Sequence, residues 1–224
     1  LQIREALDRQ TSQVERLART WGAGADQAFP AWEADARRQI FELGAGELGC
    51  QSIAYLGRDR RVVWAFPEAA NDLLRGVHES ADDEKRAAID LAENTRGPVV
   101  SPTTTVLSPA RTSAKGVVIY SPVIRAGAVA GFVAATFEYE PFFRQIALTR
   151  VPQLTEKYHL AVLIGGERVY RLAVPEAAVH DDYTLDRVYP IASRRIRILL
   201  TPTATTLKET RRFLPTLALG AGIG

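Results

Sequence analysis

Apolar residues recur along the first 21 positions at intervals that fit one face of a helix. Leu7, Val14 and Trp21 are seven residues apart, and polar residues fill the opposite face. The apolar face also includes Ile3, Leu17 and Ala18. This pattern predicts an amphipathic helix about 30 Å long with coiled-coil character. Its apolar face either packs on the rest of the chain or pairs with a second copy.

A second helix and a hairpin are predicted after a glycine-containing break. The segment AWEADARRQIFEL places Trp32 and Ile40 on one helical face, and GAGELG ends the pattern. Next, QSIAYLGRDRRVVWAFP alternates around a polar turn at Gly57–Arg60, which predicts a hairpin. The tip of this hairpin carries three arginines, Arg58, Arg60 and Arg61. We interpret them as a solvated turn rather than a phosphate-binding site.

A further helix and a long hairpin complete the first half of the chain. Residues 80–97 begin with acidic residues and end at a glycine, and Ser80 is the expected N-cap, with Asp83 three residues later. The segment GVVIYSPVIRAGAVAGFVAATF, residues 116–137, reads as two apolar strands joined at 125–128. A short helix then follows from residue 140. Helices flanking an antiparallel sheet fit this order of elements.

The pattern changes near Leu148, where shorter strands predict a second, smaller sheet. HLAVLIGGERVYRL and YTLDRVYPIASRRIRILLTP each indicate a pair of strands, and Thr206 with Glu209 has the spacing of a capping box. We therefore expect an α+β fold in which a long N-terminal helix precedes two antiparallel-sheet units. The expected parts are a stalk helix (1–24), a ligand-binding unit (25–147), a smaller unit (148–203) and an exit helix (204–224).

Composition and the chain ends narrow the class of protein. The 224 residues are 46% hydrophobic with a formal net charge of +2, which fits a folded domain and does not suggest a nucleic-acid-binding protein. A single cysteine excludes an internal disulfide. The chain contains no methionine, and an apolar run at 213–224 follows Arg211 and Arg212. We expect a fragment whose tail begins a transmembrane helix, although a C-terminal core segment is the alternative.

Catalytic and metal-binding motifs are missing from the sequence. The three histidines, His78, His159 and His180, lie far apart and lack partners at metal-ligand helical spacing. Asp181 and Asp182 beside His180 are better explained as a polar loop. No nucleophile elbow, dinucleotide-binding motif or P-loop occurs, and Cys50 has no obvious base nearby. We therefore expect no enzyme in this chain, with no catalytic residues, no metal and no cofactor.

Several segments in order resemble the CHASE family of extracytoplasmic sensor domains. They are WEADARRQI, IAYLGRDRRVVWAFP, KRAAIDLAENTRGPVVSPTTTVL and GVVIYSPVIRAGAVAGFVAATFEYEPFFRQI, followed by LTPTATTLKETRRFLP. The resemblance covers nearly the whole chain. It implies a domain outside the inner membrane, between two transmembrane helices, with a long N-terminal helix and two PAS-like units, one distal from the membrane and one proximal to it. It also implies a small-molecule ligand in the distal unit, a homodimer through the N-terminal helices, and a cytoplasmic histidine kinase or cyclase module.

The long hairpin is the expected centre of the ligand site. A sheet that is apolar on both faces must be covered on both, and binding pockets are mostly apolar with a few placed polar groups. The expected ligand-binding residues are Trp64, Phe66, His78, Val118, Tyr120, Phe132, Ala134 and Thr136. Plant members of the family bind adenine-type hormones through an aspartate and a threonine, where this chain has Val77 or His78 and Tyr120. We therefore expect a different small organic ligand. The alternative is a periplasmic protein-binding or dimerisation module without a small ligand.

Overall fold

The computed structural model describes residues 2–24, 29–42, 49–108, 111–150, 157–172, 183–191 and 194–208. The chain divides into two compact units, residues 1–145 and 146–224. The helical elements are α1 (Gln2–Ala23), α2 (Phe29–Arg37), the π-helical turn η1 (Arg38–Glu42), α3 (Glu68–Leu74), the 3₁₀ turn η2 (Glu79–Ala81), α4 (Asp83–Thr95) and α5 (Tyr139–Arg150). The strands of the first unit are β1 (Cys50–Gly57), β2 (Val62–Phe66), β3 (Val99–Val100), β4 (Thr104–Ser108), β5 (Arg111–Arg125) and β6 (Ala128–Glu138).

The first unit is built on a six-stranded sheet, and the antiparallel sheet predicted from the sequence is confirmed. Its strand order is β2-β1-β6-β5-β3, and β4 also pairs with β5. The central hairpin β5–β6 turns at Ala126 and Gly127, whose φ angles are 48° and 77°. Two consecutive positive φ values match the twist of a tight hairpin. Every strand pair in this sheet is antiparallel, which confirms the predicted α+β class.

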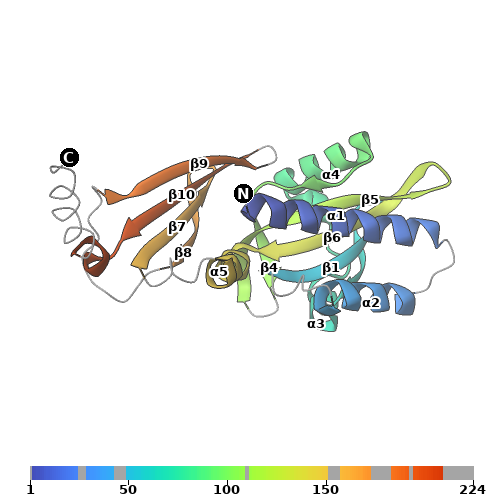
Figure 1. Ribbon diagram of the computed structural model, residues 1–224. Helices are drawn as coiled ribbons and strands as arrows, with labels where there is room; N and C mark the ends of the chain where they lie inside the picture. The colour runs from blue at the N-terminus through green and yellow to red at the C-terminus, as the bar shows by residue number, and fades with distance from the viewer. Residues whose placement is uncertain are drawn as a thin grey trace, which may run out of the picture. The chain divides into compact units, whose positions relative to one another are not determined.

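The first face of this sheet is covered by α1 and α2, and we call it the helix-α1 face. Figure 1 shows α1 running along β5 and β6 with α2 beside it. From the stripe predicted in the sequence, Val14, Ala18 and Trp21 are fully buried there, while Leu7 is half-buried. Gly22 permits the close approach, because a Cβ at this position would lie 2.5 Å from the carbonyl oxygen of Ile124 on β5. The apolar face of α1 therefore packs within the chain, while its outer face is polar.

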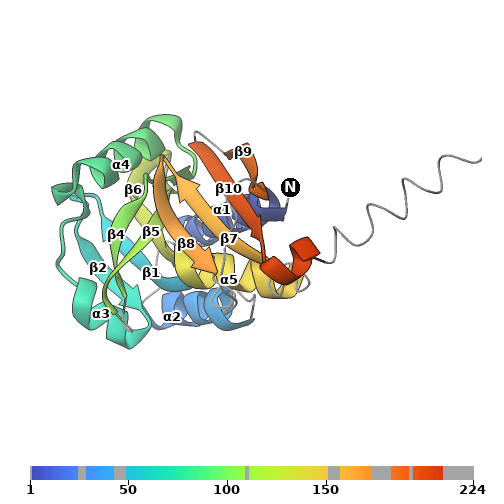
Figure 2. The same cartoon turned by 90° about the vertical axis from the view of Figure 1, so that its left-hand side faces the viewer.

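The second face is covered by α3 and α4, and we call it the helix-α4 face. In Figure 2, α4 and α1 lie on opposite sides of these strands. The apolar cluster on this face draws on both helices and on β1, β2, β4, β5 and β6. The hairpin tip is not solvated throughout, because the Arg60 guanidinium lies 2.6 Å from Asp90 and 3.1 Å from Glu93 on α4. These ion pairs hold the hairpin against the helix.

Two predicted helix caps are wrong by a few residues. Asp82, not Ser80, caps α4, because its carboxylate accepts hydrogen bonds from the backbone amides of Glu84 and Lys85. Near the C-terminus, the Thr203 hydroxyl accepts from the Thr206 amide at 3.3 Å, so the helix begins earlier than the predicted capping box. Both errors arise because several neighbouring residues have side chains able to cap a helix, and tertiary contacts decide among them.

The second unit contains a four-stranded antiparallel sheet of order β8-β7-β10-β9. Its strands are β7 (Tyr158–Ile164), β8 (Glu167–Leu172), β9 (Leu185–Ile191) and β10 (Arg194–Pro202). The sequence predicts two antiparallel sheets with the second one smaller, and the structure confirms both. Among the residues that the structure describes, no helix combines the length and hydropathy needed to cross a bilayer. The apolar run at 213–224 lies outside the described residues, as do His180, Asp181 and Asp182.

Candidate functional site

Tyr120 is the centre of a polar network on the otherwise apolar helix-α4 face. It lies on β5, fully buried, and pairs with Ala134 on β6 and Val99 on β3. Because Ala134 and its neighbour on β1, Ala54, are small, the tyrosine ring has room to lie over the sheet. The strand pairing therefore positions the phenol beneath the segment that leads into α4.

The Tyr120 hydroxyl donates a hydrogen bond of 2.8 Å to Glu79 Oε2 in η2. Lys85 Nζ lies 3.0 Å from the same carboxylate oxygen, and the side chains of Lys85 and Glu79 are only 16% and 8% exposed. Burial raises the pKa of Tyr120 well above its ordinary value, and the nearby Glu79 charge raises it further. The phenol therefore keeps its proton and acts as a donor. One buried carboxylate thus joins a strand, a turn and a helix.

The start of α4 fixes the position of Lys85. The Asp82 carboxylate accepts hydrogen bonds from the amides of Glu84 at 2.9 Å and Lys85 at 3.1 Å, and Thr104 on β4 donates to its other oxygen at 3.1 Å. Burial alone would raise the pKa of Asp82, but these hydrogen bonds together lower it. Asp82 therefore stays ionised and anchors the helix end that carries the lysine.

Some polar atoms on the helix-α4 face lack a partner among the described residues. Ser80 Oγ, beside Glu79, and Ser52 Oγ on β1 are both buried and accept or donate no hydrogen bond there. Ser52 shares the face of Tyr120, because it pairs with Thr136, which pairs with Val118. Glu138 Oε1, two residues beyond Thr136, is likewise buried without a partner. Buried polar atoms are normally satisfied, so these positions offer hydrogen bonds to a guest.

Five of the eight predicted ligand-binding residues lie together on this face. Val118, Tyr120, Phe132 and Ala134 belong to one buried apolar cluster. Thr136 is half-buried and shares the face by its pairing with Val118. In the described structure the protein's own side chains fill the space over these residues.

The other three predicted residues lie elsewhere. Trp64 is on the helix-α1 face, where its ring centre lies 5.9 Å from that of Trp21. Phe66 shares that face, and the Arg37 guanidinium lies 5.2 Å from its ring centre. His78 is half-buried, forms a β-bridge with Arg61 and directly precedes Glu79. The structure therefore does not bring Trp64 and Phe66 together with Tyr120.

Two residues of the network were missed in the sequence, Glu79 and Lys85. The resemblance to plant family members places Val77 or His78 at the position of their aspartate. Glu79, one or two positions later, is the acidic residue that accepts the hydrogen bond from Tyr120. Lys85 is not singled out by the sequence pattern, which indicates only acidic residues at the start of this helix. An acidic residue just before a helix, combined with a tyrosine on the central strand, is the signal that would have indicated both.

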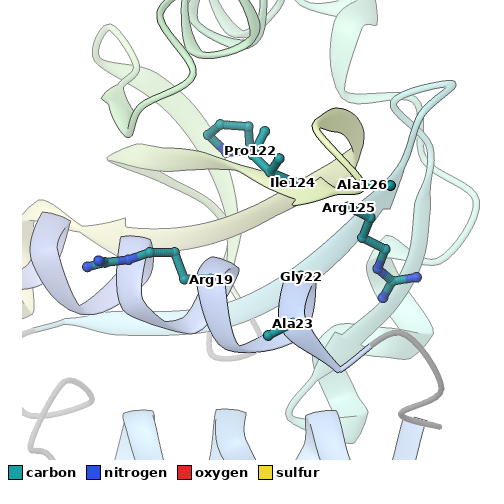
Figure 3. Close-up of a pocket in the computed structure, with 7 residues that line it drawn as sticks. All are labelled: Arg19, Gly22, Ala23, Pro122, Ile124, Arg125 and Ala126. Carbon is teal, nitrogen blue, oxygen red and sulfur yellow. The ribbon is translucent and has the colours of Figure 1, made fainter.

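In the described part of the chain, two surface hollows border α1. Figure 3 shows the first, a pocket of about 540 Å³ between the end of α1 and the β5–β6 turn. Arg19 and Arg125 line it but point away from one another. Arg125 Nη2 instead donates to the Trp21 carbonyl at 3.0 Å, near the end of α1. The second, about 230 Å³, lies between α1 and the α2–η1 segment. Two of its polar side chains are already paired, because Gln39 Nε2 donates to Gln13 Oε1 at 3.1 Å.

Metal-ligand clusters and reactive thiols are two further kinds of site that side chains can form. Within them, no group of three or more histidine, cysteine, aspartate or glutamate side chains is arranged to hold a metal ion. Cys50 is buried, and burial raises the pKa of its thiol to about 12. A thiol with that pKa stays protonated near neutral pH and is a poor nucleophile.

Comparison with solved structures shows which fold this is. An extracellular ligand-binding receptor from Desulfohalobium retbaense matches with a TM-score of 0.61 and 16% identity over 89% of this chain, which spans 37% of that receptor's chain. The ligand-binding domain of the Pseudomonas aeruginosa amino acid chemoreceptor PctB, in complex with L-Arg, matches with a TM-score of 0.59 and 13% identity, covering 92% of this chain and 90% of that one. The corresponding domain of PctC, in complex with GABA, gives 0.57 and 11%, covering 89% and 93%.

The TM-scores above 0.5 show a shared fold, that of PAS-like sensor domains, and confirm the predicted fold class. No curated protein matches the chain. The family model described as the CHASE domain matches residues 11–168, which is more than half of the chain. That match confirms the resemblance seen in the sequence: the chain belongs to the CHASE domain family.

Proposed function

We propose that this chain is the extracytoplasmic ligand-sensing domain of a membrane-bound receptor of the histidine kinase or diguanylate cyclase type. The observation that carries the proposal is the buried Glu79–Lys85 pair with the Tyr120 hydroxyl on an apolar face. Removing two charges from water is costly, and apolar residues of similar volume are often at least as stable in their place. The pair therefore contributes little net stability, and ligand recognition is a reason to keep it.

The charges in the network indicate the class of ligand. Glu79 would accept hydrogen bonds from a protonated amine, and Lys85 would bind a carboxylate. A small zwitterion such as an amino acid would satisfy both by replacing the internal ion pair with two ligand contacts. Structural relatives in complex with L-Arg and with GABA support this class, since both ligands carry an amine and a carboxylate. Val118, Phe132 and Ala134 would form the apolar part of the site.

Strand β5 connects the proposed site to α1. Its Tyr120 side chain faces the network, while its far end contacts α1 through the close approach at Gly22 and the Arg125 hydrogen bond to the Trp21 carbonyl. A ligand that separates Glu79 from Lys85 would change how η2 and α4 hold β5. Such a ligand shifts the signalling equilibrium only by its differential affinity for the two states.

We also propose where each part of the chain lies relative to the membrane. Residues 25–147 would form the membrane-distal ligand-binding unit and 148–203 the proximal unit. Residues 204–224 would form an exit helix leading into a transmembrane segment, with a second membrane helix before residue 1. A homodimer through residues 1–24 would use the polar outer face of α1, because Val14, Ala18 and Trp21 on its apolar face are already buried in the chain. Light scattering of the purified chain tests that dimer.

A thermal-shift screen against amino acids, amines and small organic acids tests ligand sensing. We expect one class of zwitterion to raise the melting temperature of the wild type, and Tyr120→Phe to reduce that rise. Tyr55→Phe is the matched control, because Tyr55 also donates one hydrogen bond, to the Ala130 carbonyl, but lies on the helix-α1 face. If no compound stabilises the chain, or if both variants respond equally, this site does not sense a small molecule, and a protein-binding or dimerisation module becomes the better explanation.

A further inference from the structure

The outer face of the second sheet carries arginines from two strands. In one row across the sheet, Leu163 on β7 pairs with Arg168 on β8 and with Arg197 on β10. In the next row, Ala161 pairs with Arg171 on β8. Residues two apart on a strand point to the same side, so Arg195 shares the side of Arg197. We call this surface the basic face; its arginines are Arg168, Arg171, Arg195 and Arg197.

The opposite side of the same sheet is its core side. Val162, Ile164, Tyr170 and Ile196 alternate with the residues of the basic face and are buried. All four arginines of the basic face are exposed. The alternation of buried and exposed positions along β7, β8 and β10 therefore presents the arginines to solvent.

Positive charge is in excess on the basic face. Among the residues that the structure describes on this face, the acidic one is Asp186 on β9. It forms an ion pair with Arg197: Nη2 lies 2.6 Å from Asp186 Oδ2, and Nε lies 3.0 Å from each carboxylate oxygen. Arg168, Arg171 and Arg195 form no ion pair with the acidic residues that the structure describes on this sheet. Three guanidinium groups thus remain available to an external anion.

Apolar side chains lie between these charges. Leu163 and Leu199 are half-buried, and Val188, in the same row as Arg197, is 54% exposed. The arginines on β8 and those on β10 are two strand spacings apart, about 10 Å. This spacing spreads the arginines over a surface two strands wide. An extended surface that has anionic groups above an apolar layer could bind the arginines through its charges and the aliphatic side chains through its apolar layer.

We propose that the basic face binds an anionic phospholipid surface. The proposal rests on the proposed function, because membrane anchoring would hold the chain beside a bilayer. Each arginine near an anionic membrane surface strengthens binding by roughly fivefold. Together, the three unpaired arginines are expected to strengthen vesicle binding by about a hundredfold at low ionic strength.

Co-sedimentation of the chain with phospholipid vesicles tests this proposal. We expect binding to vesicles of phosphatidylglycerol and phosphatidylcholine, and much weaker binding to pure phosphatidylcholine. The variant Arg168→Gln/Arg171→Gln/Arg195→Gln should lower the partition coefficient by about a hundredfold. The matched control is Arg58→Gln/Arg75→Gln/Arg96→Gln, which removes the same charge from three exposed arginines of the first unit.

Several outcomes would overturn the proposal: equal losses in both triple variants, equal binding to neutral vesicles, or no binding to anionic vesicles. Raising the salt concentration to about 1 M provides a test without substitutions, because it shortens the Debye length to about 3 Å and should release the bound wild type. The thermal-shift response to amino acids, measured on the same variants, separates this proposal from ligand sensing. If vesicle binding fails while the ligand response persists, only the membrane proposal is overturned. If the ligand response is absent while vesicle binding persists, only ligand sensing is overturned.

Discussion

The buried ion pair beside Tyr120 yields a prediction with a defined magnitude. Replacing Lys85 by methionine keeps much of the side-chain volume but leaves the Glu79 carboxylate buried with the Tyr120 hydroxyl as its partner in the network. At 3.0 Å and an effective dielectric constant of 20, the lost attraction is about 5.5 kcal/mol. The desolvation of Lys85 that is no longer required offsets part of this loss. We therefore expect the free energy of unfolding to fall by about 3 kcal/mol.

The double variant Glu79→Gln/Lys85→Met gives the contrasting result. Glutamine still accepts the hydrogen bond from Tyr120, and no unpaired charge remains in the network. We expect this variant to lie within about 1 kcal/mol of the wild type, far from the sum of the single changes, because the two residues are coupled. Both variants should lose the response to amino acids.

Urea denaturation followed by tryptophan fluorescence measures both variants. All three tryptophans of the chain, Trp21, Trp32 and Trp64, lie in the first unit, so the signal reports unfolding of that unit. Lys115→Met, at an exposed position on β5, is the control for the same chemical change. A loss below about 1 kcal/mol in Lys85→Met, or additive effects in the double variant, would refute the reasoning about the pair.

Three further changes test the packing and the electrostatics of the first unit. Gly22→Ala should lower the free energy of unfolding by about 2 kcal/mol in urea titrations, because its Cβ would meet the Ile124 carbonyl; an unchanged midpoint would contradict that close approach. Gln10→Leu should raise the same free energy by about 1 kcal/mol, because both amide atoms of Gln10 are buried without a described partner. The pKa of Tyr120 is raised on folding, so stability should be fully present below pH about 10 and fall at higher pH, less steeply in Tyr120→Phe than in Tyr55→Phe. Equal slopes in these two variants would exclude Tyr120 as a main source of that loss.

The sequence predicted what depends on periodicity. The α1 stripe, the hairpin around Gly57–Arg60 and the β5–β6 hairpin follow from the spacing of apolar residues, and strand parity placed Val118 with Tyr120. Neither periodicity nor parity shows which side chains of one hairpin lie on the same face of the sheet as those of another hairpin. The sequence therefore predicts Trp64 in the same site as Tyr120, although the sheet separates them.

The polar network could not be predicted because it depends on tertiary distances. Glu79 and Lys85 are six residues apart, in a turn and in a helix, and Asp82 rather than Ser80 caps the helix that carries Lys85. The role of α1 was also left open. An apolar stripe fits a second copy as well as a sheet, and the close approach at Gly22 shows which surface the stripe meets.

Hydrogen exchange of the chain with and without an amino acid that raises its melting temperature tests the central claim most directly. The account predicts slower exchange in residues 78–95 and in β5 around Tyr120, with a change in the last turns of α1. Protection confined to the hollows beside α1 or to the second unit, with exchange in 78–95 unaltered, would contradict it.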